Sequence, residues 1–206
     1  MESEKIFEVL TAMSRKMEEE KLYLTDLDNA TGDGDHGINM AKGFSAMAEK
    51  LPTLAGQSLG AVFKTVGMTL VSAVGGSAGP LYGTAFLKSA LVMGEKTGMD
   101  MDDFLTCLGA AIEGIMMRGH AVRGEKTMLD AMIPALDAMK AAKADGLAPR
   151  DILDAGVTAA HEGIEFTKTI AATKGRASYI GERSIGHEDP GAVSFTYLLE
   201  VVACAV

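Results

Sequence analysis

The sequence has no tryptophan, and aromatic residues make up only 5% of its 206 positions. Strands are typically built from runs of β-branched and aromatic residues, and such runs are missing here. The hydrophobic 48% instead consists largely of short or flexible side chains, and the chain has 24 glycines and 14 methionines. This composition favours closely packed helices and provides enough apolar material for a sizeable core.

Basic residues and cysteines are scarce as well. Lys and Arg number 19 against 28 Asp and Glu, so the net charge is -9, which disfavours nucleic acid as a partner. Cys107 and Cys204 form neither a CxxC pair nor a metal-binding spacing, and we expect both to be reduced core residues. The charged N-terminus lacks a signal core, and no apolar run approaches a membrane span. We therefore expect a cytoplasmic protein without a nucleic-acid or membrane partner.

Apolar periodicity and capping residues predict eight helices and no strand. No low-complexity linker divides them, so residues 1–206 are predicted to form one all-α domain. Ser58 and either Asp100 or Asp102 are expected to cap helices, and Pro149 is expected to start one. The predicted helices span approximately residues 3–20, 36–50, 58–73, 83–96, 101–118, 128–144, 149–169 and 191–206.

Four glycine-rich loops follow the first, third, fifth and seventh predicted helices. In an up-down antiparallel arrangement, alternate loops lie at the same end of the bundle. The sequence therefore predicts one composite site at that end. The loops span residues 28–37, 74–83, 118–127 and 171–191.

The stretch from residue 25 to 39 is the most informative of the four. Its four aspartates are Asp26, Asp28, Asp33 and Asp35, and carboxylates this close in sequence either share protons or bind a cation. The spacing does not fit an EF-hand, and oxygen donors favour Mg²⁺ or Ca²⁺ over zinc. A following helix N-terminus could bind an anion such as phosphate. A solvated acidic turn that caps this helix is the alternative interpretation.

The other loops suit phosphate chemistry to different degrees. Residues 75–79 could present backbone N–H groups at a helix start, with Ser77 as a further donor, although a simple helix–helix turn would have the same composition. Residues 119–127 resemble a Walker A loop, but Glu125 intrudes before Lys126 and the preceding segment is helical. In the last loop, Arg176 is the cation best placed to close over a phosphate, unless it is merely solvated.

Four motifs closely resemble the ADP-binding L subunits of bacterial dihydroxyacetone kinases, the DhaL family, over essentially the whole chain. The resemblance implies an eight-helix antiparallel barrel with the nucleotide at one end. Glu125 is a departure, because relatives often have Asp there. The motifs are Asp28-x4-Asp33-x-Asp35-His36-Gly37, residues 75–80, residues 124–128, and the run from Lys174 to Gly191.

The resemblance also implies roles for individual residues. Asp28, Asp33 and Asp35 would hold two Mg²⁺ ions, whereas Asp26 falls outside the pattern. Arg176 would act on the transferring phosphate, as the catalytic residue. The implied ADP/ATP-binding residues are His36, Gly37, Ile38, Asn39, Ser77, Ala78, Gly119, Met128, Arg176, Asp189, Pro190 and Gly191.

The family implies two partner subunits and a phosphotransfer activity linked to the phosphotransferase system. A phosphohistidine on an M subunit rephosphorylates bound ADP, and the γ-phosphate passes to dihydroxyacetone held on a K subunit. Two alternatives stay open: the L half of an ATP-exchanging kinase for another small ketose, and a partner that signals its nucleotide state to a transcription regulator. The sequence leaves open whether the chain is a monomer or a homodimer.

Overall fold

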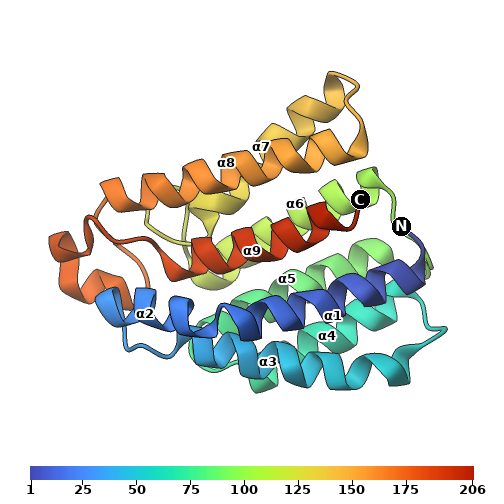
Figure 1. The fold of residues 1–206 in the computed structure, drawn as a ribbon, viewed down its shortest axis with the longest axis horizontal. Coiled ribbons are helices and arrows are strands. Elements are labelled where there is room, and N and C mark those ends of the chain that lie inside the picture. Colours follow the sequence, from blue (N-terminus) through green and yellow to red (C-terminus); the bar gives the residue numbers. More distant parts are fainter. The chain divides into compact units, whose positions relative to one another are not determined.

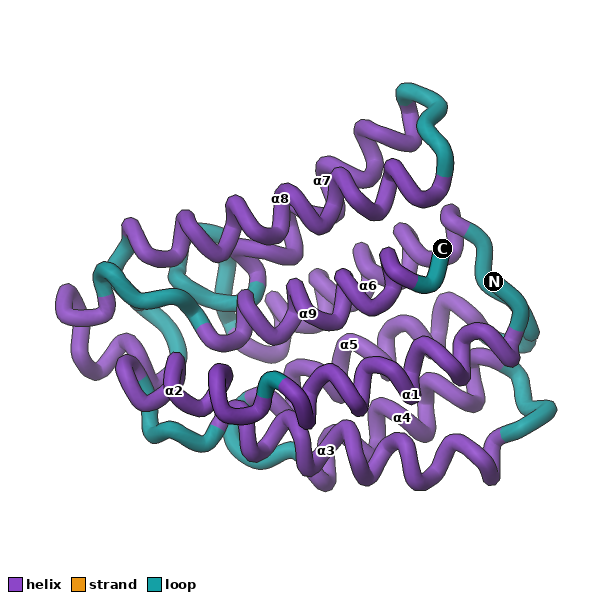
Figure 2. Tube along the Cα trace, in the orientation of Figure 1, coloured by secondary structure: helices purple, strands orange, loops and turns teal.

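The computed structural model describes all 206 residues and is entirely helical apart from its loops (Figures 1 and 2). A single isolated β-bridge, between Glu2 and Gly98, is the only extended pairing. No helix is long and apolar enough to cross a membrane. The elements are α1 (Ser3–Glu19), α2 (Lys21–Thr31), α3 (His36–Lys50), η1 (Leu51–Leu54), α4 (Leu59–Ala73), α5 (Ala78–Met93), α6 (Met101–Gly119), α7 (Leu129–Ala144), α8 (Pro149–Thr169), η2 (Arg176–Ser184) and α9 (Pro190–Cys204).

The all-α prediction is confirmed, but the expected count of eight helices is one too low. The additional helix is α2, which occupies the first part of the predicted aspartate loop. Its buried face consists of Leu24, Asp28 and Thr31, which have helical spacing but only one apolar member. Because hydrophobic periodicity was the criterion, this face could not be recognised as helical.

Capping residues predicted several helix starts correctly. Ser58 accepts a hydrogen bond from Ala61 N and caps α4. Asp100, one of the two expected caps, forms a capping box with Asp103 at the start of α6. Prolines occupy the first turn of α8 and of α9, where a missing N–H costs nothing. The helix after residues 74–77 begins earlier than expected, at Ala78 instead of about residue 83.

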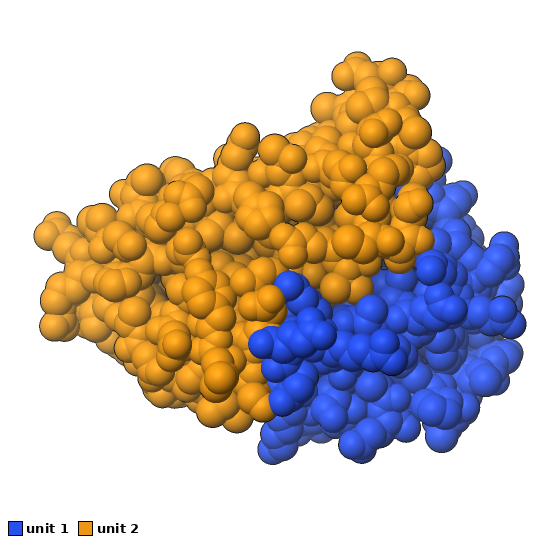
Figure 3. All heavy atoms as spheres, viewed as in Figure 1, with its two compact units in different colours: residues 1–19, 39–120 blue, residues 20–38, 121–206 orange.

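The chain divides into two compact units, coloured separately in Figure 3. Unit 1 contains residues 1–19 and 39–120, and unit 2 contains residues 20–38 and 121–206. In unit 1, α5 packs between α4 and α6, and Phe63 and Phe86 meet edge to face at 5.9 Å. In unit 2, α8 and α9 pack on α7, while α2 contacts α9 and η2. Whether the whole chain behaves as one domain stays a prediction.

Candidate metal and phosphate site

Three carboxylates come together where α2 ends. Asp28 lies in the last turns of α2, and Asp33 and Asp35 lie in the loop before α3. Carboxylate oxygens of the three residues lie within 4.8 Å of one another. Asp26 lies on an exposed part of α2 and is not a member of the cluster. The structure thus brings together the three aspartates selected from the sequence.

Asp28 organises this loop through its buried carboxylate, which is only 8% exposed. Its Oδ2 accepts hydrogen bonds from the backbone N–H groups of Asp35 (2.9 Å) and His36 (3.1 Å). These donors lie at the start of α3, where a negative charge is favourable. The N–H of His36, one of the helix-start groups that the sequence suggested for phosphate, is therefore already bonded to a carboxylate of the protein.

The cluster suits a small, hard divalent cation. All three side chains offer anionic oxygen, the donor that Mg²⁺ and Ca²⁺ prefer, and none offers sulfur. Asp33 and Asp35 are less buried than Asp28, so the cluster has a face towards solvent. An ion held there would relieve the repulsion of three neighbouring negative charges.

Arg176 connects this cluster to a distant part of the chain. Residues 171–187, which follow α8 and contain η2, are called the lid below. The sequence predicted an irregular loop here, but Ser178 and Ser184 each donate a hydrogen bond of 2.6 Å to the carbonyl three residues earlier and support short 3₁₀ turns. Arg176 opens η2, and its Nη2 lies 2.8 Å from Asp33 Oδ2. Its guanidinium side chain is 57% exposed and so remains accessible to a ligand.

His36, the first residue of α3, is held by the start of α9. Its Nε2 lies 3.0 Å from Ser194 Oγ, and its ring also forms a hydrogen bond with the carbonyl of Pro190. Burial lowers the pKa of His36, and the charges of Asp28 and Asp35 oppose this shift only in part. The predicted residues 36 and 190 are thus directly connected, and Ile38 is exposed two positions further along α3.

The predicted residues 189–191 form the start of α9. Asp189 caps this helix by accepting a 2.7 Å hydrogen bond from Ala192 N, and its own N–H donates to Thr167 Oγ1. A Cβ added at Gly191 would lie 3.0 Å from Asp189 Oδ2 and in ordinary van der Waals contact with Met128 Cβ, at 3.4 Å. A side chain at residue 191 would therefore crowd the Asp189 carboxylate.

The pKa of Asp189 is raised to about 7, mainly because burial disfavours the charged carboxylate. The charges of Asp130 and Asp28 raise the pKa further, while the Ala192 N–H and Lys126 oppose the rise.

A proton on Asp189 should therefore stabilise the folded state at low pH. Between about pH 4 and pH 7 the folded state binds this proton more strongly than the unfolded state does, so the Asp189 contribution to stability falls as pH rises. Asp189→Asn keeps the capping oxygen but does not ionise. Relative to the wild type, the variant should gain stability progressively over that range, by at most about 4 kcal/mol.

Urea unfolding at pH 4.5 and pH 7.5 checks this prediction. Asp137→Asn, at an exposed position on α7, serves as the control and should show no such pH-dependent gain. Parallel pH profiles for the wild type and Asp189→Asn would contradict the prediction.

The remaining predicted residues, Asn39, Ser77, Ala78 and Gly119, belong to unit 1. Within that unit Asn39 adjoins the glycine-rich loop, since a Cβ at Gly75 would lie only 2.6 Å from the Asn39 Oδ1. Ser77 precedes α5 and its hydroxyl makes no capping hydrogen bond, while Ala78 is buried. Gly119 is the last residue of α6. Their part in nucleotide binding stays a prediction.

Two buried charged residues, Lys126 and Asp130, were not among the predicted site residues. Both side chains are almost fully buried, at 2% and 0% exposure. Asp130 accepts hydrogen bonds from Gly124 N and Thr127 N, which shapes the loop before α7. Glu125, where relatives often have Asp, accepts a hydrogen bond from Val122 N, and its carboxylate lies 4.0 Å from Lys174 Nζ. No periodic signal marks such residues, because their partners lie in other segments.

Comparisons with known proteins identify the family of the chain. The DAK2 domain matches residues 30–204. The chain is 40% identical to the ADP-binding subunit DhaL of PEP-dependent dihydroxyacetone kinase from Escherichia coli, over 90% of this chain and 89% of that protein. It is 45% identical to the corresponding subunit of dihydroxyacetone kinase 1 from Listeria innocua, over 94% and 91% of the two chains.

A solved structure shows the same fold. It is the dihydroxyacetone kinase from C. freundii in complex with AMP-PNP and Mg²⁺, and it matches with a TM-score of 0.76 at 23% identity. The match covers 97% of this chain but only 33% of that longer chain. The family model and the two bacterial subunits cover most of the sequence, and the chain therefore belongs to the DAK2 domain family.

Proposed function

We propose that this chain is the ADP-binding subunit of a phosphoenolpyruvate-dependent dihydroxyacetone kinase. The observation that carries the proposal is the cluster of Asp28, Asp33 and Asp35 with Arg176 at its edge. Phosphoryl transfer requires anionic oxygens that hold a divalent cation and a cationic side chain next to them. The likeness to two bacterial ADP-binding subunits over nearly their whole length supports the same conclusion.

Each part of the site has a proposed role. Asp28, Asp33 and Asp35 would hold two Mg²⁺ ions, which when bound neutralise and orient phosphoryl oxygens. Arg176 would leave Asp33 to stabilise the phosphate in transit, using a planar guanidinium that matches phosphate oxygens. His36, Met128 and residues 189–191 would bind the nucleotide within unit 2. Nucleotide-binding roles for residues 37–39, 77, 78 and 119, which the family resemblance implies, are part of the same proposal.

The proposal includes two partner proteins. A phosphohistidine carrier would supply the phosphoryl group, and a separate subunit that holds dihydroxyacetone would receive it at a hydroxyl oxygen. The P–N bond of the carrier breaks in the first transfer, and a P–O ester bond of the product forms in the last. The bound nucleotide carries the phosphoryl group between the two partners.

Phosphotransfer can be tested with the purified protein. The chain should bind ADP in the presence of Mg²⁺ and become loaded with labelled phosphate when mixed with the phosphorylated carrier. Added Mg²⁺ and ADP should also protect the lid against proteolysis. Absence of nucleotide binding together with absence of lid protection would refute the proposal.

Nucleotide exchange separates this proposal from an ATP-exchanging ketose kinase. Retention of the bound nucleotide through prolonged dialysis is expected for a coenzyme that is recharged in place. Rapid replacement by free ATP in solution would instead favour the exchanging enzyme.

A further inference from the structure

Lys126 is an unusual residue in the loop before α7. Its side chain is 2% exposed, although lysine is almost never fully buried without partners. Its backbone φ is +60°, in the left-handed region that residues other than glycine rarely adopt. Both features carry an energetic cost, so the surrounding structure must compensate for them.

The compensation comes from three backbone carbonyl groups. Lys126 Nζ donates to the carbonyl oxygens of Thr167 at 2.5 Å, His187 at 2.6 Å and Ile170 at 3.5 Å. An ammonium group has three donors and no acceptor, so these carbonyls match its full hydrogen-bonding capacity. Thr167 and Ile170 lie at the C-terminal end of α8, where a cation is also favourable to the helix dipole.

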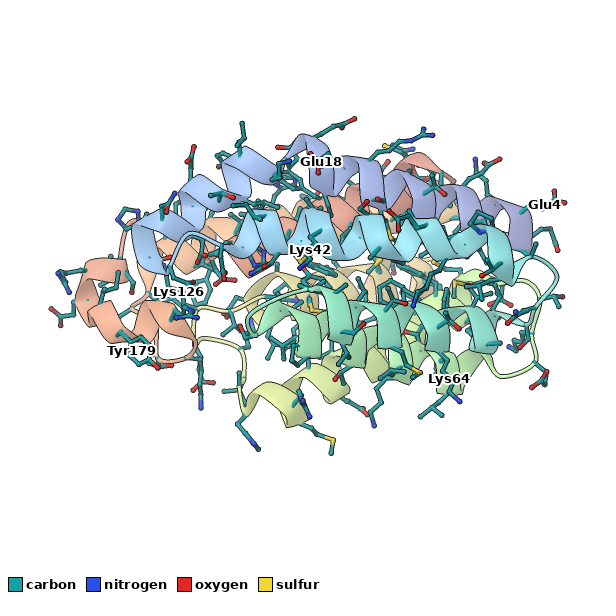
Figure 4. The ribbon with its side chains drawn as sticks, turned by 90° about the horizontal axis from the view of Figure 1, so that it is seen from below. Glu4, Glu18, Lys42, Lys64, Lys126 and Tyr179 are labelled. Carbon is teal, nitrogen blue, oxygen red and sulfur yellow. The ribbon has the colours of Figure 1, made fainter.

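These three partners lie at the two ends of the lid. Residues 167 and 170 precede its first residue, and His187 is its last. A single ammonium group therefore connects both ends of a segment that carries Arg176. The lid itself bears exposed side chains, including Tyr179, which is labelled together with Lys126 in Figure 4.

Backbone contacts reinforce the same base. Thr173 N donates to the carbonyl of Glu125 at 3.3 Å, and Gly186 N donates to the carbonyl of Lys168 at 2.8 Å. Ala172 N donates to Ser184 Oγ at 2.8 Å. The two ends of the lid, called its base below, are thus hydrogen-bonded to each other and to residues 125 and 126. The segment η2 lies between these two ends in the sequence.

Two carboxylates oppose the effect of burial on Lys126. Burial lowers the pKa of its ammonium group, and the charges of Asp189 and Asp130 counteract this shift in part. Asp130 additionally fixes the loop that carries Lys126 through its hydrogen bonds to Gly124 N and Thr127 N. The cation therefore has a defined position relative to α7, α8 and α9.

We propose that Lys126 is the positioning residue of the lid: its ammonium group fastens both lid ends and so holds Arg176 at the carboxylate cluster. The expected effect on the transfer rate rests on the proposed phosphotransfer function, whereas the attachment of the lid ends by Lys126 does not. Misplacement of a reacting group by about 1 Å can cost about 100-fold in rate. Loss of the hydrogen bonds that hold the lid ends should therefore slow phosphoryl transfer, although every group that touches phosphate is still present.

Lys126→Met tests the proposal, because methionine keeps an unbranched apolar side chain but has no donor. Hydrogen exchange of the amides at residues 171–187 should accelerate at least tenfold in the nucleotide-free variant. The single-turnover phosphotransfer rate should fall about 10- to 100-fold, while the Kd for ADP with Mg²⁺ should change by a much smaller factor. Lys126→Arg keeps the cation and should lose less than Lys126→Met on both measures. Lys140→Met, at an exposed lysine on α7, should leave both unchanged.

The wild-type protein provides a measurement that needs no variant. Amides at the base, such as Gly186, should exchange much more slowly than those of η2. Equal exchange at the two places, unchanged lid exchange in Lys126→Met, or a rate equal to the wild type's would each overturn the proposal. If the wild type itself transfers no phosphate, the proposed function fails, and the exchange data still decide whether Lys126 fastens the lid.

Discussion

Replacing Asp33 by asparagine should abolish measurable binding of both Mg²⁺ and ADP. The substitution keeps the size of the side chain but removes one of three negative charges and one anionic ligand from the cluster. Residues that only support a metal ligand already change metal affinity by about 10- to 100-fold, so loss of a direct ligand should exceed that range. Isothermal titration with Mg²⁺ and ADP measures the effect.

Asp26→Asn is the matched control for this substitution. Asp26 lies on α2 close to the cluster in sequence, yet it is exposed and not one of the three grouped carboxylates. The control variant should bind ADP as the wild type does. Normal ADP binding by Asp33→Asn would contradict the role assigned to the cluster.

Substitution of Arg176 by alanine should have the opposite pattern, with binding kept and transfer lost. Its guanidinium contacts Asp33 and is more than half exposed, so it can turn to a phosphate. An arginine that stabilises charge in phosphoryl transfer contributes about 10³-fold or more to the rate. We expect a loss of that order in single-turnover transfer, with the Kd for ADP changed only a few-fold.

Two further variants sharpen the Arg176 test. Arg176→Lys keeps the charge but loses the planar pair of donors, so it should recover only part of the rate. Arg183→Ala removes a second exposed arginine from the same η2 segment and should transfer at the wild-type rate. Wild-type transfer by Arg176→Ala would exclude the proposed catalytic role.

The parts of the molecule that depend on local chemistry were predictable from the sequence. Ser58 and Asp100 mark helix starts because their side chains accept hydrogen bonds from backbone N–H groups three residues later, and Pro149 does so because it has no N–H of its own. The aspartates 28, 33 and 35 could be selected from four candidates because the family resemblance pointed to them. In the structure, the carboxylate groups of these three residues lie next to one another.

The parts that depend on distant partners were not predictable. Lys126 appeared within a rejected Walker A pattern and a family motif but received no role, because its three carbonyl partners lie 41 to 61 positions further along the chain. Asp28 was expected to face a metal, but its hydrogen bonds to Asp35 N and His36 N follow only from the close approach of α2 and α3. The helix α2 was not predicted because a carboxylate and a hydroxyl occupy two of its three buried positions.

The division of the chain into units has a consequence for how the site forms during synthesis. Residues 20–38 emerge from the ribosome early, but their partners in unit 2 begin at residue 121. Arg176 follows Asp33 by 143 positions, and pairings over such separations are slow to form. The pairing of Arg176 with Asp33 must therefore wait until nearly the whole chain has been made. It is among the last contacts of the candidate site that a nascent chain can complete.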